Sequence, residues 1–204
     1  MKTIQTETES TIRERGSKFY GFLFPCNSVD SFELKLEELK NHYPDATHHC
    51  SAYRIISEQI IEYSNDDGEP SGTAGLPILN TLKSAELVNI GAVVVRYYGG
   101  SKLGKAGLID AYSISISECI NIATIGDLQK VFRLKISYDY AQESHIKQII
   151  HTLKLTESEQ EFTETVTKII QGPIQKENDC VRLFEAVSYL GVSFELLDHI
   201  FVMN

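Results

Sequence analysis

The sequence lacks long apolar runs, paired cysteines and an excess of basic residues. Its apolar runs are far shorter than the roughly 20 residues that a membrane helix needs, so no membrane contact is expected. Residues 1–10 are polar and acidic, without the apolar stretch of a signal peptide. The four cysteines, Cys26, Cys50, Cys119 and Cys180, form no C-x-x-C pair. We therefore expect reduced, buried cysteines and a cytoplasmic protein.

The formal net charge is −9, and both halves of the chain are acidic. Affinity for nucleic acid depends largely on cations that neutralise phosphates, so any RNA contact requires a local basic patch. The window from Arg96 to Lys105 contains three basic residues and no acidic one. This window is the predicted patch.

The order of apolar and polar residues predicts an α+β chain with two domains, residues 1–127 and 128–204. In the first, strands are expected at 17–26, 50–57, 59–64 and 89–98, and helices after residue 30 and at 72–87 and 103–124. Residues 125–129 are interpreted as a linker. The second has the order strand, helix, two strands, helix, strand, which is the ferredoxin-like βαββαβ pattern.

Two glycine-rich loops separate predicted strands from predicted helices, and we interpret them as one binding surface. Glycine allows another molecule to approach the main chain closely. The acidic loop contributes Asp66, Asp67, Gly68, Glu69, Ser71, Gly72 and Thr73. The glycine loop contributes Arg96, Tyr97, Tyr98, Gly99, Gly100, Lys102, Gly104 and Lys105.

The carboxylates of the acidic loop allow two interpretations. They could hold Mg²⁺ or act as an acid/base pair. Alternatively, Asp66 and Asp67 satisfy backbone amides of a turn, which we favour. Arg54 and Arg96 are the expected ion-pair partners of the loop. His48 and Cys50 could converge on one face of a strand, but no second ligand pair has zinc spacing. We predict no metal site, cofactor or catalytic residue.

The glycine loop resembles a nucleotide-binding P-loop in part. Residues 99–106 read G-G-S-K-L-G-K-A, so Ala106 stands where the magnesium-binding hydroxyl is needed. Binding of a small anion by the loop and the following helix N-terminus is the alternative that we retain. Tyr97 and Tyr98 could stack on RNA bases.

The two loops together carry a family resemblance. The run Asp66–Gly75, the run Arg96–Gly100, and the later pairs Leu103-Gly104 and Gly107-Leu108 resemble the signature of the IMPACT/YigZ family. The tripeptide at residues 111–113, and His48, Cys50 and residues 52–54 upstream, also match its pattern. The sequence departs from that pattern at Leu76 and Asp110, which stand where basic residues are common, and at Lys105 and Ala106.

The resemblance implies a first domain like the second domain of ribosomal protein S-five and domain IV of elongation factor G. It implies a second, ferredoxin-like domain similar to domain V of that factor. It also implies a non-catalytic role in translational regulation through RNA, ribosome or protein contacts. The alternative is an enzyme that acts on a phosphorylated or nucleotide substrate through the two loops. Fold analogy alone is a weak basis for either function.

Overall fold

The computed structural model describes residues 1–57 and 59–203, and the chain divides into two compact units. The first is Met1–Asp127 and the second is Leu128–Val202. Strand β7 (Ile125–Tyr138) begins in the first unit, where residues 125–127 pair with the short strand β1 (Lys2–Ile4). Residues 125–129, which we interpreted as a linker, therefore belong to a strand.

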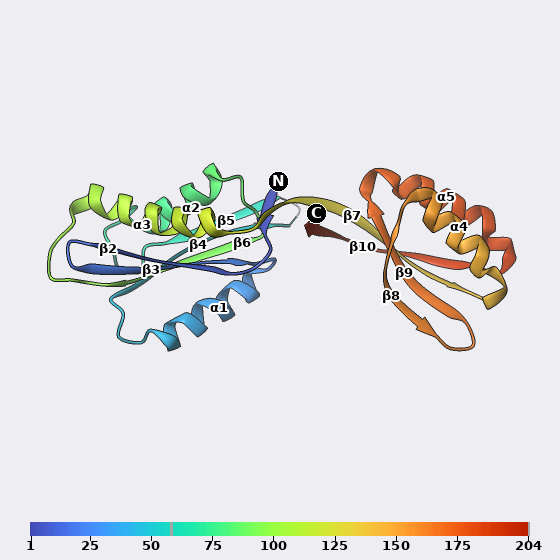
Figure 1. Cartoon of the computed structure of the whole chain (residues 1–204), viewed down its shortest axis with the longest axis horizontal. Helices are drawn as coiled ribbons and strands as arrows, with labels where there is room; N and C mark the ends of the chain where they lie inside the picture. Colours follow the sequence, from blue (N-terminus) through green and yellow to red (C-terminus); the bar gives the residue numbers. More distant parts are fainter. Residues whose placement is uncertain (58, 204) are drawn as a thin grey trace. The chain divides into compact units, whose positions relative to one another are not determined.

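The first unit contains a five-stranded sheet with the order β2-β3-β6-β4-β5. Its strands are β2 (Thr8–Glu14), β3 (Ser17–Pro25), β4 (His48–Ile56), β5 (Ile60–Asn65) and β6 (Ile90–Tyr97). Its helices are α1 (Val29–His42), α2 (Gly75–Ser84) and α3 (Gly104–Ile122). Figure 1 shows α1 on one face of this sheet and α2 and α3 on the other.

The central strand β6 contributes to a hydrophobic core on each face of the sheet. Successive side chains of a strand point to opposite faces. Ala92 and Val94 accordingly lie in the core beneath α2 and α3, whereas Val93 and Val95 lie in the core against α1. This alternation places the next residue, Arg96, on the α2–α3 side at the end of the strand.

Strand β2 is absent from our sequence-based prediction. It pairs antiparallel with β3 through a tight turn at Arg15 and Gly16, whose φ angles are 46° and 84°. Positive φ at both central residues is typical of a type I′ hairpin turn. None of the seven residues of β2 is buried, so the strand carries little apolar signal.

The second unit has the element order β7-α4-β8-β9-α5-β10, with short 3-10 turns at Tyr140–Gln142, Ile174–Lys176 and Ser188–Leu190. The elements not yet bounded are α4 (Glu143–Leu153), β8 (Thr156–Phe162), β9 (Val166–Pro173), α5 (Glu177–Val187) and β10 (Ser193–Met203). Strand β7 pairs with β9 and with β10, and β9 pairs with β8. Figure 1 shows α4 and α5 on one face of this sheet.

The second unit has its own core of buried side chains, among them Phe132, Ile146 and Phe184. We therefore expect residues 128–204, expressed alone, to unfold in one cooperative thermal transition monitored by circular dichroism. A matched fragment of residues 1–127 should show a separate transition. A fragment 128–204 that gives a disordered spectrum would contradict its assignment as an independent domain.

Candidate functional site

The acidic and glycine loops lie side by side, as predicted from their positions after strands. Strands β5 and β6 both pair antiparallel with β4, so they run in the same direction and their following loops emerge at the same end of the sheet. Glu69 of the acidic loop forms a salt bridge with Arg96 at the end of β6. The contact between the loops is therefore a direct ion pair.

The ion pair between Glu69 and Arg96 is buried. The side chains are 4% and 5% exposed, respectively, so the charges are removed from solvent. The same Glu69 oxygen, Oε1, accepts a hydrogen bond from the Tyr112 hydroxyl at 2.8 Å. Arg96 also donates through Nη2 to Ser17 Oγ at 3.3 Å. A buried ion pair needs such additional hydrogen bonds to offset the desolvation of both charges.

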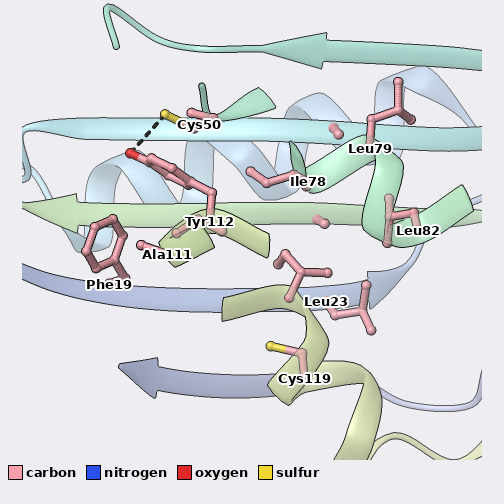
Figure 2. Close-up of a cluster of buried hydrophobic side chains, with 14 of the residues drawn as sticks. Phe19, Leu23, Cys50, Ile78, Leu79, Leu82, Ala111, Tyr112 and Cys119 are labelled. Atoms are coloured by element: carbon pink, nitrogen blue, oxygen red, sulfur yellow. Dashed lines mark hydrogen bonds between the residues drawn. The ribbon is translucent and has the colours of Figure 1, made fainter. Parts of the chain in front are cut away.

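Tyr112 connects this ion pair to the core. It lies on α3 and is fully buried, and Figure 2 shows its hydroxyl pointing toward Cys50 of β4. Cys50 Sγ lies 3.3 Å from the Tyr112 oxygen and 3.0 Å from the Asp66 carbonyl oxygen. Burial raises the pKa of Cys50 and of Tyr112, and the neighbouring Glu69 raises both further. Both side chains stay protonated, whereas a cysteine nucleophile requires the thiolate.

Asp66 organises the start of α2. Its Oδ1 accepts hydrogen bonds from the backbone N–H groups of Ala74 and Gly75 at 3.0 and 2.9 Å, and its Oδ2 accepts from Gly72 at 2.8 Å. The first N–H groups of a helix have no partner within the helix, so a carboxylate at this position stabilises it. The helix begins at Gly75, three residues later than predicted from sequence.

Asp67 is used in the same way on the other side of the turn. Its Oδ2 accepts from the backbone N–H of His49 at 2.6 Å, and its carbonyl oxygen lies 2.7 Å from His48 Nδ1. The interpretation of Asp66 and Asp67 as turn-forming residues is therefore confirmed. Among the described residues, no cluster of three or more His, Cys, Asp or Glu side chains could hold a metal ion.

The expected pairing of Arg54 with the acidic loop is wrong. Arg54 Nε donates instead to Glu62 Oε1 at 3.0 Å, and its Nη1 donates to the Leu87 carbonyl at 2.7 Å. Glu62 is its neighbour across the β4–β5 pair, which is a much shorter reach than the loop. The cross-strand partner is therefore favoured.

The predicted site residues differ in exposure. Those that are buried are Glu69, Thr73 and Arg96. Those that are partly buried are Asp66, Asp67, Gly72 and Tyr97. Those that face solvent are Gly68, Ser71, Tyr98, Gly99, Gly100, Lys102, Gly104 and Lys105. Arg96 therefore does not contribute its charge to a solvent-facing patch, which is a correction to the basic window identified from the sequence.

The network also includes two residues that our sequence analysis did not place in it. Ser17 contacts both loops, because its Oγ lies near Arg96 and accepts from the Gly99 N–H at 3.1 Å. Tyr112 is part of an apolar helix face, where its hydroxyl needs a hydrogen-bond partner. A tyrosine in such a face is a signal that a polar group lies opposite it.

No helix in the described part of the chain is long and apolar enough to cross a membrane. The model of the Impact N-terminal domain family matches residues 15–120. A Bacillus subtilis protein, IMPACT family member YvyE, is 35% identical over 80% of this chain and 76% of its own length. IMPACT family member YigZ of Escherichia coli is 34% identical over 66% of this chain and 67% of its own.

A solved structure, described as the crystal structure of a hypothetical protein, superposes with a TM-score of 0.69 at 25% identity. It covers 96% of this chain, and the match includes 95% of that chain. The family match includes both loops and the buried network between them, from Ser17 to Tyr112. The chain therefore belongs to the IMPACT family.

Proposed function

We propose that this chain is a non-catalytic binding protein of translational regulation that acts in the cytoplasm through RNA, ribosome or protein contacts. The observation that carries the proposal is the use of Asp66, Asp67 and Glu69 as structural groups. Each accepts hydrogen bonds that hold the loops in place. What remains exposed is a rigid glycine-rich surface with two lysines, Lys102 and Lys105.

The enzyme alternative requires groups that are free to exchange protons or to attack a substrate. Cys50 is a buried thiol with a raised pKa, and Glu69 is bound to Arg96 and Tyr112. Neither is placed to meet a substrate from solvent. The names of the matched bacterial relatives assign them to the IMPACT family rather than to a class of enzyme. Both observations favour the binding function.

Membership of the family supports the link to translation, because the family resemblance implies translational control. The finer fold assignments belong to the same proposal. The first unit would correspond to domain IV of elongation factor G and the second to its ferredoxin-like domain V. The βαββαβ order of the second unit supports this. A small anion at Gly100 and Gly104, in front of α3, remains part of the proposed binding surface.

Co-sedimentation with ribosomes and separated subunits across a potassium chloride series tests the proposal. We expect the full chain to pellet with at least one particle at low salt, and the pelleted fraction to fall as salt rises. The double variant Lys102→Ala/Lys105→Ala should pellet less than Lys40→Ala/Lys147→Ala, which removes the same charge from exposed helix positions. Absence of the protein from all pellets, together with turnover of a nucleotide, would favour the enzyme alternative.

A further inference from the structure

The turn of the β2–β3 hairpin packs directly against the glycine loop. A Cβ atom added to Gly99 would lie 1.9 Å from the Gly16 carbonyl carbon and 2.3 Å from the Ser17 nitrogen. The Gly99 N–H also donates to Ser17 Oγ at 3.1 Å. Residues 13–18 and 98–105, far apart in the sequence, therefore form one continuous surface, which we call the hairpin–glycine corner.

The corner gathers positive charge in an acidic chain. Its exposed cations are Arg13, Arg15, Lys18, Lys102 and Lys105, and its single acidic residue is Glu14. Five cations less one carboxylate leave a local charge of +4, within a chain of net charge −9. Glu14 is 3.8 Å from Arg15 Nε. No other cation of the corner forms an ion pair with a carboxylate of residues 1–57 or 59–203.

Two of these cations are placed unfavourably. Arg13 of β2 and Lys18 of β3 lie directly opposite each other in the antiparallel register. Like charges in such a pair destabilise a hairpin. An anion bound between them would relieve this repulsion, so the pair itself indicates a negatively charged ligand.

An aromatic hollow adjoins these charges. It has a volume of about 220 Å³ and is lined by Gly16, Lys18, Tyr20, Tyr97 and Tyr98. Complete small-molecule ligands occupy pockets of about 300–1,000 Å³, so this hollow suits one flat ring of a longer molecule. Tyr98 is 47% exposed and therefore offers ring surface to such a ligand.

The hollow is held in shape before any ligand binds. The Tyr98 N–H donates to Thr47 Oγ1 at 3.0 Å, and the buried Arg96 guanidinium lies 5.5 Å from the centre of the Tyr98 ring. The Tyr20 ring stacks on Tyr43 at 5.5 Å and meets Tyr97 edge-on at 6.1 Å. A preorganised ring surface loses little conformational entropy on binding.

We propose that the hairpin–glycine corner binds single-stranded RNA, with one base stacked on Tyr98 in the hollow and the adjacent phosphates on Arg13, Lys18 and Lys102. This inference rests on the proposed function and specifies its ligand and surface. Cations beside exposed aromatic rings are the combination by which proteins hold single strands. In a duplex the bases are already stacked on each other, so the hollow selects for an unpaired base. An acidic peptide would use the cations and leave the ring surface unused.

Fluorescence anisotropy of a short, labelled single-stranded RNA with the full chain, over a potassium chloride series, tests this proposal. Tyr98→Ala should weaken binding about tenfold, because stacking of a base on an aromatic ring contributes roughly that much. The triple variant Arg13→Ala/Lys18→Ala/Lys102→Ala should lower the slope of log K against log salt by about 2, since each phosphate contact to a single strand contributes about 0.7.

The matched control is Lys40→Ala/Lys130→Ala/Lys147→Ala, which removes three exposed lysines outside the corner and should leave the slope unchanged. Thermal unfolding should show that all variants fold. The proposal is overturned if wild type fails to bind, if duplex RNA binds as tightly, or if control and corner variants lose affinity equally. It is also overturned if Tyr98→Ala has no effect, which would indicate an acidic ligand. Undiminished co-sedimentation of the corner variants with ribosomes would leave the proposed function intact through protein contacts.

Discussion

Replacement of Glu69 with alanine is expected to lower the free energy of unfolding of the first unit by about 3–5 kcal/mol. The variant leaves the Arg96 guanidinium buried without a counter-charge and the Tyr112 hydroxyl without its carboxylate acceptor. An uncompensated buried charge is far more costly than the loss of an exposed ion pair. Urea unfolding of the full chain, followed by circular dichroism, measures the effect as a fall in the midpoint of the first unit's transition.

Glu62→Ala is the matched control. Glu62 also forms two ion pairs, with Arg54 at 3.0 Å and Lys83 at 2.8 Å, but its side chain is 29% exposed. Solvent screens these pairs, so we expect a loss of less than about 1 kcal/mol. Glu69→Gln, which keeps an acceptor oxygen but not the charge, should lie between the two alanine variants. Equal losses for Glu69→Ala and Glu62→Ala would show that Glu69 does not hold the loops together.

The approach of the two loops could be predicted from the sequence, because each follows a strand and precedes a helix. The burial of Arg96 was accessible to the same reasoning but was missed. Ala92, Val94 and Arg96 are two residues apart and so share one face of β6, the face that packs beneath the helices. A basic residue in line with two core residues is better interpreted as a buried ion-pair partner than as a surface cation.

The hairpin could not be recognised from local signals. The turn residues are Arg15 and Gly16, whereas asparagine or aspartate before glycine is the strong sequence signal for a type I′ turn. Strand β2 also lies at the edge of the sheet, where it buries no residue completely. Because the strand was missed, the cations Arg13, Arg15 and Lys18 were not associated with the glycine loop. Their proximity depends on a long-range contact between Gly16 and Gly99, which local sequence patterns do not specify.

Gly99→Ala is expected to destabilise the first unit by about 3 kcal/mol, at the upper end of the cost of overpacking. The new Cβ would lie 1.9 Å from the Gly16 carbonyl carbon and 2.2 Å from its oxygen. Both are backbone atoms, so no side chain can rotate away, and the hairpin turn has to move. The hydrogen bond from the Gly99 N–H to Ser17 Oγ would be strained by the same movement. Urea unfolding and RNA anisotropy should both report the change.

Gly107→Ala separates this effect from the general replacement of a glycine. Gly107 lies within α3, where the added Cβ would be 3.1 Å from Leu103 Cβ, a tighter contact than usual but with a side-chain atom. Alanine is favoured over glycine in a helix by about 1 kcal/mol, which offsets this contact. We therefore expect stability within about 1 kcal/mol of wild type and unchanged RNA binding. Stability that is intact in both variants would mean that the hairpin turn is not seated on Gly99. The Arg13–Lys18 pair and the glycine-loop lysines would then no longer form one surface for a single strand.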